Sequence, residues 1–306
     1  DDDARLVVTV ARTAAALGAK ILTRVRARAL HAHGADAEDL LTGESLHLRA
    51  RAVINATGVW AGSLDDGIRV RPSRGTHIVL DAADLGHPTA ALAIPHPGSI
   101  SRYVFALPQA DGLVYVGLTD EDAPGAVPEV AEPTDAEITF LLDTLNRVLD
   151  SPLPRERVRG AFAGLRPLVD SGDAATADIS RRHLVSESGD GFVSVLGGKL
   201  TTYRRMAEDA VDLAVEVGRL DAGACRTASL RLVPLPEHLP QRPLVDGVTA
   251  TEQDVVNAVR EEGALSADDV LERRLRVGLV PSRRAALLSP VTEIVERMLA
   301  ELSASG

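Results

Sequence analysis

The feature that most constrains the fold of this chain is a short apolar strand that runs into two glycines and then into a helix. The stretch reads Ser194-Val195-Leu196-Gly197-Gly198-Lys199-Leu200-Thr201-Thr202-Tyr203-Arg204. Glycine has no Cβ, so a ligand can come close to the backbone at the two glycines. The start of the helix presents unpaired N–H groups and partial positive charge, which favour an anion or an electron-rich ring edge, and Lys199 adds a full charge. The stretch therefore predicts a binding turn, although two glycines alone more often form an ordinary hinge.

A second strand is predicted to end at a similar turn. Residues 46–54 alternate in polarity and then become fully apolar, as in a strand that enters a sheet interior, and they lead into Asn55-Ala56-Thr57-Gly58-Val59-Trp60. Ligands of open α/β sheets bind beyond the carboxyl ends of the strands. The small residues Ala56 and Gly58 would let a ligand approach the backbone, while a plain turn remains the alternative.

The other periodic segments predict a mixture of helices and strands. A helix is expected from Asp1 to Leu17, ended by Gly18, and Thr134-Asp135-Ala136-Glu137 has the pattern of a capping box at the start of another. The remaining expected elements are strands over 21–25, 76–80, 92–95, 103–107, 113–118, 158–165 and 192–196, a polar hairpin region over 31–44, a linker over 232–243, and three short helices within 251–303 that begin near Thr249, Ser266 and Ser289-Pro290.

Composition excludes several classes of function. The net charge of −11 argues against a nucleic-acid partner, which requires a basic patch. Cys225 is the one cysteine, so an internal disulfide is excluded, a reducing compartment is favoured, and a zinc site is disfavoured because the histidines show no metal-ligand spacing either. The sequence has no G-x-S-x-G elbow, and a length of 306 residues predicts more than one domain.

Several motifs resemble those of FAD-dependent glycerol-3-phosphate dehydrogenases, in the same order along the chain. The glycine–lysine stretch GGKLTTYR resembles the flavin-contacting segment of that family, and the others cover most of residues 2–217. They are Asp2-Asp3-Ala4-Arg5-Leu6, Asn55-Ala56-Thr57-Gly58-Val59-Trp60, Gly75-Thr76-His77-Ile78-Val79, Arg102-Tyr103-Val104-Phe105, Gly117-Leu118-Thr119-Asp120, Gly164-Leu165-Arg166-Pro167-Leu168 and Ile179-Ser180-Arg181. Val59 stands where the family usually has proline.

The resemblance implies a mixed α/β (α+β) flavoprotein fold of the D-amino-acid-oxidase-like kind, with an antiparallel substrate sheet and a helical C-terminal domain. The expected parts are a partial FAD-binding domain (1–71), the substrate sheet (72–190), a return segment of the FAD domain (191–222) and the helical domain (223–306). The G-x-G-x-x-G fingerprint that holds a dinucleotide pyrophosphate does not occur in the sequence. We therefore expect the family's ADP-binding part to lie outside this sequence, which would be a fragment of a longer enzyme.

The resemblance also assigns a candidate site. Oxidation of a phosphorylated secondary alcohol requires a hydride acceptor, which is the flavin, a base for the hydroxyl proton and a cationic clamp for the phosphate. The expected clamp is Arg166, fixed in a turn between Gly164 and Pro167, with Lys199 and Arg181 as further substrate ligands; Arg102 also matches a family position. His77 is the candidate base, with a structural, hydrogen-bonded histidine as the equal alternative. The residues expected to contact FAD are Ala56, Thr57, Gly58, Trp60, Gly197, Gly198, Lys199, Leu200 and Thr201, and helix capping by Thr201 and Thr202 is the alternative role for the threonines.

The function implied by the resemblance is oxidation of sn-glycerol 3-phosphate to dihydroxyacetone phosphate, with electrons passed to a membrane quinone. The expected location is the cytoplasm, with peripheral contact on the inner face of the cytoplasmic membrane, and a homodimer is compatible with it. Two alternatives stay open. One is a related flavin oxidase of an amine or a 2-hydroxy acid, in which Arg166 would clamp a carboxylate. The other is a non-catalytic fragment that binds a phosphorylated metabolite.

Overall fold

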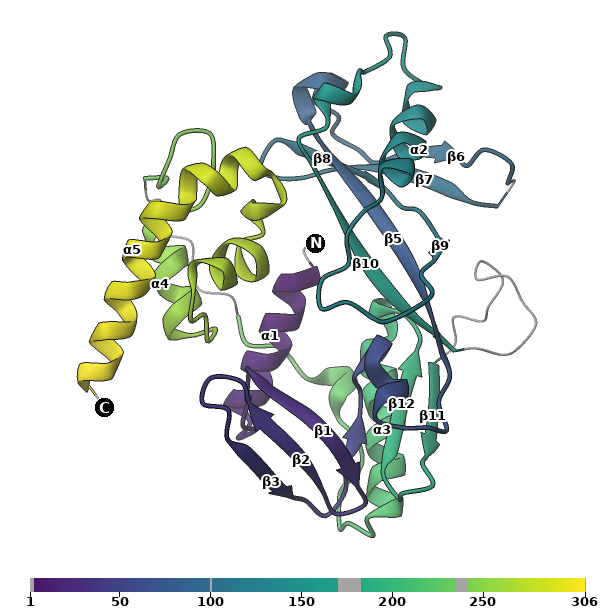
Figure 1. Ribbon diagram of the computed structural model, residues 1–306, viewed down its shortest axis with the longest axis vertical. Helices are drawn as coiled ribbons and strands as arrows, with labels where there is room; N and C mark the ends of the chain where they lie inside the picture. Colours follow the sequence, from purple (N-terminus) through teal and green to yellow (C-terminus); the bar gives the residue numbers. More distant parts are fainter. Residues whose placement is uncertain (1–2, 100, 170–182, 235–241, 306) are drawn as a thin grey trace.

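The computed structural model describes residues 3–99, 101–169, 183–234 and 242–305. Within these ranges the strands form a small antiparallel sheet, a large antiparallel sheet and a short mixed sheet. Figure 1 shows the large sheet at the upper right, the other two sheets below it, and a C-terminal helical unit at the left. The domain boundaries expected after residues 71, 190 and 222 stay predictions.

The N-terminal segment forms a helix and the small sheet. Helix α1 (Asp3–Ala16) is followed by Gly18 with a φ of 95°, a left-handed conformation that suits glycine. The small sheet has the order β1 (Val25–His31), β2 (Gly34–Asp39) and β3 (Ser45–Arg49). The strand predicted over 21–25 was wrong. Ile21 and Leu22 are about half exposed, and Arg24 has a left-handed φ of 60°, so extended structure begins only at Val25.

The strand predicted over 46–54 was also wrong in its extent. Strand β3 ends at Arg49 and is mostly exposed, and β4 (Ile54–Asn55) is a separate two-residue strand in another sheet. The alternation of residues 46–49 reflects pairing with β2 at the surface rather than entry into a sheet interior. Only β4 leads into the Asn55 turn.

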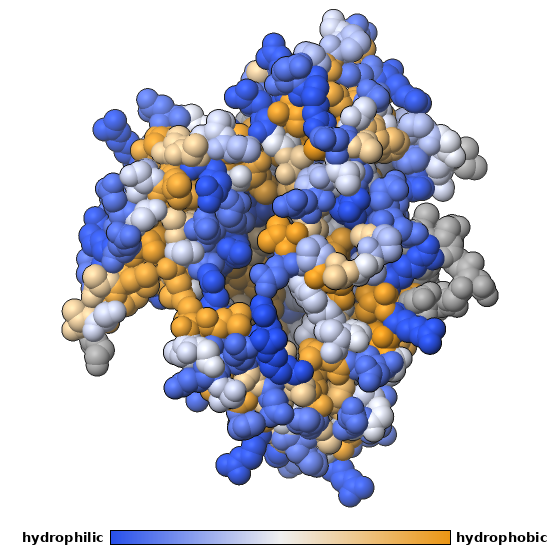
Figure 2. Space-filling view, in the orientation of Figure 1, coloured by the Kyte–Doolittle hydropathy of each residue, from blue (hydrophilic) through white to orange (hydrophobic). Residues whose placement is uncertain are grey.

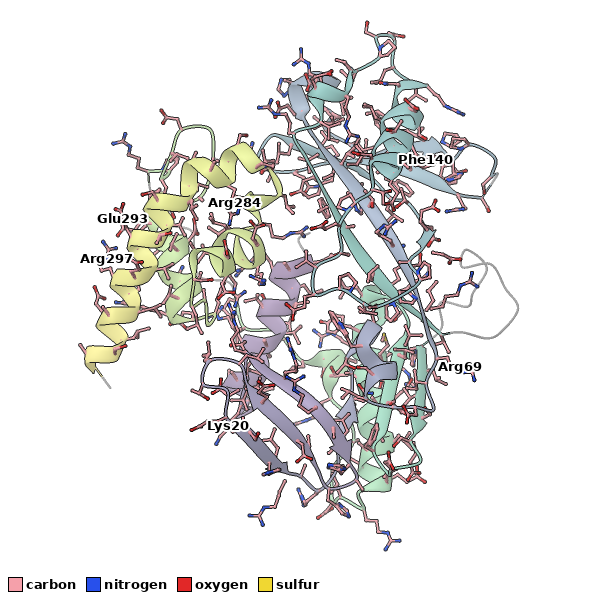
Figure 3. The ribbon with its side chains drawn as sticks, viewed as in Figure 1. Lys20, Arg69, Phe140, Arg284, Glu293 and Arg297 are labelled. Carbon is pink, nitrogen blue, oxygen red and sulfur yellow. The ribbon has the colours of Figure 1, made fainter. Side chains whose placement is uncertain are left out.

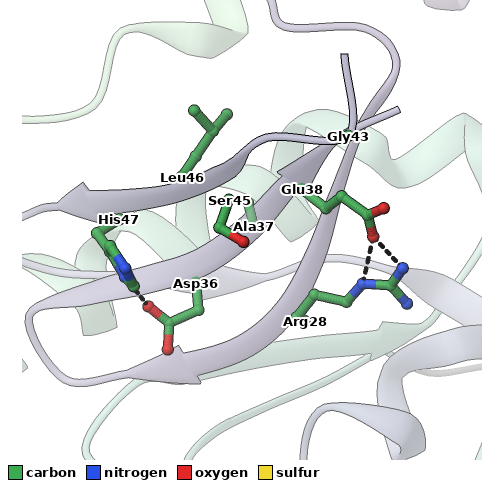
Figure 4. A pocket seen from close by; sticks show the side chains of 8 residues that line it. All are labelled: Arg28, Asp36, Ala37, Glu38, Gly43, Ser45, Leu46 and His47. Atoms are coloured by element: carbon green, nitrogen blue, oxygen red, sulfur yellow. Dashed lines mark hydrogen bonds and ion pairs between the residues drawn. The ribbon is translucent and has the colours of Figure 1, made fainter. Parts of the chain in front are cut away.

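Charged side chains of the small sheet line an open surface cavity, drawn in Figure 4. In it the His47 Nδ1 lies 2.7 Å from the Asp36 Oδ1, and the Arg28 guanidinium donates to the Glu38 carboxylate on the neighbouring strand. Hydrogen bonds from His47 and His31 hold the pKa of Asp36 below its usual range. Each of these side chains therefore has a hydrogen-bonding partner on a neighbouring strand, and the cavity is part of the solvent-exposed surface of the sheet.

The large sheet has the strand order β10-β5-β8-β7-β6, with β9 also paired to β5. Its strands are β5 (Val70–Asp81), β6 (Leu92–Pro95), β7 (Tyr103–Pro108), β8 (Leu113–Gly117), β9 (Glu121–Asp122) and β10 (Gly160–Val169). Side chains alternate between its faces. Ile78 and Leu80 of β5 are fully buried on one face, where they pack in one cluster with Leu141 and Leu145 of helix α2 (Asp135–Asn146). The opposite face carries His77 and Val79.

The predicted capping box at the start of α2 is confirmed and is part of a buried polar network. The Thr134 hydroxyl accepts from the Glu137 N–H at 3.3 Å, while the Glu137 carboxylate accepts from the Thr134 N–H at 2.9 Å. The same carboxylate, 4% exposed as a residue, accepts from the Thr119 hydroxyl at 3.0 Å and pairs with the Arg74 Nε at 2.9 Å. Glu137 thus ties α2 to β5 and to the segment after β8.

Replacing Glu137 by glutamine is expected to lower the free energy of unfolding by about 2–4 kcal/mol at pH 7, because Arg74 loses its buried partner. Burial alone would raise the pKa of Glu137, but the hydrogen bonds from Thr134 and Thr119 and the charge of Arg74 bring it below the ordinary value of 4.5. The ionised carboxylate therefore stabilises the fold above that value, and the gain is lost as the pH falls through the lower folded pKa.

Urea unfolding of both proteins from pH 7 to pH 3.5 tests this prediction, with Glu293→Gln as a control. Glu293 lies on the exposed side of α5 (Pro281–Ser305), among the side chains labelled in Figure 3, and its replacement is expected to change stability by less than about 0.5 kcal/mol. A difference between wild type and Glu137→Gln that does not shrink at low pH would contradict the role given to the carboxylate.

The C-terminal helical unit has its own core and docks on the large sheet. It contains α4 (Glu252–Arg260), a π-helical turn η6 (Asp269–Arg274), a short 3₁₀ turn η7 (Val277–Leu279) and α5. Val255, Leu271, Leu287 and Val291 are fully buried in its core. The expected helix start at Ser289-Pro290 was wrong, because α5 begins at Pro281 and continues through Pro290. The helix expected from Thr249 begins after Thr251, which is its N-cap.

Candidate functional site

Two parallel strand ends form the first part of the candidate site. Strand β4 pairs in parallel with β12 (Val193–Gly197), with Ile54 opposite Val193 and Asn55 opposite Ser194, while β11 (His183–Glu187) pairs with β12 on its other side. The carboxyl ends of parallel strands meet at the same edge of a sheet. The Asn55 turn and the glycine–lysine turn, which are far apart in the chain, therefore leave the sheet at one edge.

The turn after β4 is organised by Asn55, which is 1% exposed. Its side-chain oxygen accepts from the Thr57 hydroxyl at 2.7 Å and from the Thr57 N–H at 3.3 Å, and its amide donates to the Ala61 carbonyl at 3.4 Å. Gly58 has a left-handed φ of 60°, and a Cβ built there would meet no atom within 4 Å. The backbone at Gly58 is therefore open to a ligand, as the sequence predicts.

Ala56 and Trp60, two other residues of this turn expected to contact the cofactor, are exposed. Trp60 belongs to the 3₁₀ helix η1 (Gly58–Ser63) and lines an open surface cavity of about 640 Å³ together with Val59 and Arg69. The indole ring is 44% exposed, so a ligand could contact it.

The turn after β12 requires both of its glycines. Gly197 and Gly198 have left-handed φ angles of 72° and 75°, and a Cβ at Gly198 would lie 2.5 Å from the Met206 Sδ. Lys199 is extended and exposed, and the 3₁₀ turn η4 (Leu200–Thr202) precedes helix α3 (Tyr203–Val217). Lys199 and the threonines therefore come before the regular helix rather than in its first turn.

Neither η4 nor α3 has a side-chain cap at its start. The Thr202 hydroxyl donates to the Lys199 carbonyl at 2.9 Å, so the alternative in which Thr202 caps the helix is wrong. The first N–H groups of α3 are bonded within the preceding turn, because the Thr202 N–H donates to the Lys199 carbonyl at 2.9 Å and the Tyr203 N–H donates to the Leu200 carbonyl. The features of the two turns that fit the close approach of a flavin ring are therefore their left-handed glycines and the open space at Gly58.

His77 and Arg166 share the face of the large sheet that α2 does not cover. On β5 and β10 the register pairs His77 with Phe162 and Ser73 with Arg166. The Arg166 guanidinium lies over Gly75, where a built Cβ would be 2.3 Å from its Nη2, and the His77 ring lies over Gly117, where a built Cβ would be 2.3 Å from its Cδ2. Positions 75 and 77 are neighbours on one face, about 7 Å apart along the strand. The two glycines thus make room for a cation and an imidazole side by side.

Arg166 is held by an acidic partner rather than by the predicted turn. The segment from Gly164 to Pro167 lies within β10, so the expectation of a turn there was wrong. The Arg166 Nη1 lies 3.4 Å from the Asp120 Oδ1 and from the Ser73 Oγ, and its Nη2 donates to the Thr119 carbonyl at 3.3 Å. Strand pairing and these contacts fix the guanidinium on the face of the sheet.

His77 is neutral at physiological pH. Its ring stacks on Phe162, with centroids 5.0 Å apart and planes 7° apart. Burial, followed by the positive charges of Arg166 and Arg276, lowers the pKa of His77 to about 4. A neutral imidazole can accept a proton, and an anionic ligand beside the two arginines would make it a stronger base.

Arg276 is a residue of this face that the sequence analysis missed. Its guanidinium carbon lies 5.2 Å from the centre of the Phe162 ring, and it comes from the C-terminal helical unit. No motif surrounds it, and η7 shows no periodic pattern that would have pointed to the sheet. Only the docking of the helical unit brings it to His77.

The remaining predicted residues are placed as follows. Strand β12, which leads into the glycine–lysine turn, and η1, which begins at Gly58, both contact β10, the strand that carries Arg166. Lys199 comes two residues after the end of β12. Arg102 is half-buried immediately before β7, and Arg181 lies outside the described residues. Figure 2 shows the surface hollowed between the helical unit and the sheets, with apolar side chains beside the hollow.

Comparison with known proteins places the chain among flavoproteins. Residues 2–204 match the model of the family described as FAD dependent oxidoreductase (DAO). Glycerol-3-phosphate dehydrogenase 1 of Mycobacterium tuberculosis is 47% identical over 333 residues, which cover 97% of this chain and 64% of that protein. The mitochondrial glycerol-3-phosphate dehydrogenase SDP6 of Arabidopsis thaliana is 36% identical over 247 residues, which cover 76% of this chain and 38% of that protein.

A solved structure supports the same fold. The glycerol-3-phosphate dehydrogenase of Bacillus halodurans, complexed with FAD, matches with a TM-score of 0.74 at 22% identity, covering 99% of this chain and 72% of that one. The flavoprotein fold indicated by the motifs is therefore confirmed. The chain spans 64% of the length of its mycobacterial relative.

Proposed function

Because the chain belongs to the family of FAD-dependent oxidoreductases, we propose that it serves the FAD-dependent oxidation of sn-glycerol 3-phosphate to dihydroxyacetone phosphate. One observation carries the proposal: a fixed arginine and a neutral histidine share one face of a sheet whose strand β10 contacts β12 and η1, the elements beside the Gly197-Gly198 and Asn55 turns. The 47% identical mycobacterial relative, named a glycerol-3-phosphate dehydrogenase, supports the choice of substrate.

Each site residue has a separate role in the proposed reaction. Arg166 binds the substrate phosphate with its guanidinium, and the exposed Lys199, two residues after β12, adds a point charge. An unprotonated imidazole nitrogen of His77 accepts the proton of the secondary hydroxyl. A bound flavin, held by the turns at Gly58 and at Gly197-Gly198, supplies the hydride acceptor. Arg181 remains a proposed substrate ligand from its motif.

We further propose that the electrons pass to a membrane quinone and that the protein is cytoplasmic, bound peripherally to the inner face of the cytoplasmic membrane. The resemblance of the motifs to the quinone-linked family supports both statements, and the single cysteine fits a reducing compartment. Among the helices of the described residues, none has the length and apolarity that crossing a bilayer requires. A homodimer is proposed as the assembly, and light scattering tests it.

Steady-state turnover with a substrate panel and an electron-accepting dye tests the proposed substrate. In the flavin-loaded enzyme that contains this chain, kcat/KM for glycerol 3-phosphate is expected to exceed that for glycerol at least roughly 10³-fold, because glycerol has no phosphate for Arg166 and Lys199 to bind. Faster turnover of an amine or of a 2-hydroxy acid such as lactate would instead identify a related oxidase. Binding of glycerol 3-phosphate without turnover of any compound would identify a non-catalytic role.

A further inference from the structure

The C-terminal helical unit reaches the candidate site through a close backbone contact. A Cβ built at Gly160, the first residue of β10, would lie 2.0 Å from the Leu279 carbonyl oxygen, so only glycine lets η7 approach this strand. Val280, the residue after Leu279, is 3% exposed and packs with Val79 of β5 and Leu113 of β8. The unit therefore covers part of the face that carries His77.

This docking places Arg276 against the Phe162 ring, which stacks on His77. Arg276 has a left-handed φ of 56°, a conformation that an arginine rarely adopts and that persists only where the surroundings impose it. Its guanidinium lies against the Phe162 ring, which stacks on His77 and meets the edge of Tyr115, with centroids 5.4 Å apart. Arg276, Phe162 and His77 thus form one continuous set of contacts from the helical unit to the imidazole.

We propose that Arg276 is a positioning residue of the His77 site, by which the C-terminal helical unit fixes the Phe162–His77 stack and adds a second positive charge beside the imidazole. The inference rests on the proposed function, since it concerns the group that accepts the substrate proton. It gives the helical unit a part in a site otherwise built from the sheets.

The charges around His77 explain how Arg276 acts on the imidazole. Among the described residues, Arg166 on β10 and Arg276 before η7 act on the His77 ring, while Asp120, which faces Arg166, is paired with that arginine. Tyr115 of β8 approaches through Phe162. Both arginines disfavour protonation of His77, so the imidazole stays neutral until the anionic substrate offsets their charge.

Two measurements on the flavin-loaded enzyme test the inference: the NMR titration of the His77 imidazole, which needs no substrate, and the pH dependence of kcat/KM for glycerol 3-phosphate. In Arg276→Gln the His77 pKa is expected to rise above its wild-type value of about 4, and the acid limb of kcat/KM is expected to move to higher pH than in the wild type. Arg276→Lys keeps the charge and is expected to restore both.

Arg283→Gln is the matched control, because Arg283 pairs with Asp111 at 2.6 Å and holds the same helical unit on the sheet. It is expected to lower stability without moving the His77 titration. An unchanged titration in Arg276→Gln, or an equal change in Arg283→Gln, would overturn the inference. If the wild-type enzyme does not oxidise glycerol 3-phosphate while Arg276→Gln still moves the titration, the proposed function fails and the positioning of His77 by Arg276 stands.

Discussion

Replacing Arg166 by methionine is expected to lower kcat/KM for glycerol 3-phosphate roughly 10²- to 10³-fold, since a charge-assisted, bidentate contact with the phosphate is lost. Most of the loss should appear in KM, because the phosphate contact exists before and during the reaction. Arg166→Lys keeps the charge without the planar fork and is expected to lose about tenfold. Initial rates over a range of substrate concentrations measure both effects.

Stability has to be measured in the same variants, because Arg166 also pairs with Asp120, whose side chain is 5% exposed. Arg166→Met leaves that carboxylate without this partner and is expected to cost about 3 kcal/mol of unfolding free energy. Arg166→Lys avoids this loss, so its kinetics report on the phosphate clamp alone. Arg159→Gln, a half-exposed arginine just before β10 that pairs with Asp81, is the control and should leave kcat/KM unchanged. If Arg166→Met bound glycerol 3-phosphate as tightly as wild type, the phosphate clamp would have to lie elsewhere.

Replacing His77 by glutamine is expected to lower kcat about 10²- to 10⁴-fold with little change in KM, as for the loss of a general base. The acid limb of the wild-type pH–rate profile, which reports the titration of His77, should disappear in the variant. Normal kcat in His77→Gln would return His77 to the structural role that the sequence left open.

The pH dependence of stability checks the environment of His77 independently of turnover. Its folded pKa of about 4 lies below the unfolded value near 6.5, so the unfolded state binds more protons between these values. The wild type therefore loses stability as the pH falls from 6.5 towards 4, whereas His77→Gln lacks this loss. Chemical denaturation at pH 7 and pH 4.5 measures the difference, and parallel curves for the two proteins would mean that His77 is solvated in the fold.

Features set by neighbouring residues could be predicted from the sequence. The capping box at Thr134 needs only a hydroxyl and a carboxylate three residues apart, and it forms as expected. Strands β6, β7 and β8 match the alternating runs between proline and glycine. The Asn55 and Gly197-Gly198 turns were placed correctly at strand ends, because their glycines have backbone conformations that few other residues adopt.

Features decided by distant contacts were missed. The split between β3 and β4 depends on which sheet each segment joins, and Pro290 is tolerated inside α5, whose buried residues pack against the rest of the helical unit. Arg166 was chosen from its motif, but its fixation by Asp120 and by strand pairing involves residues 46 and 93 positions away. Arg276 carries no local signal, because its place beside His77 follows from the contact between Gly160 and Leu279.

Anaerobic absorbance spectroscopy of the flavin-loaded enzyme tests the central claim most directly. Addition of glycerol 3-phosphate in slight excess is expected to bleach the oxidised flavin bands in one turnover, and the same addition to His77→Gln or Arg166→Met should bleach them roughly 10²-fold more slowly or more. A flavin that stays oxidised with glycerol 3-phosphate, or that is bleached equally fast in wild type and both variants, would contradict the account.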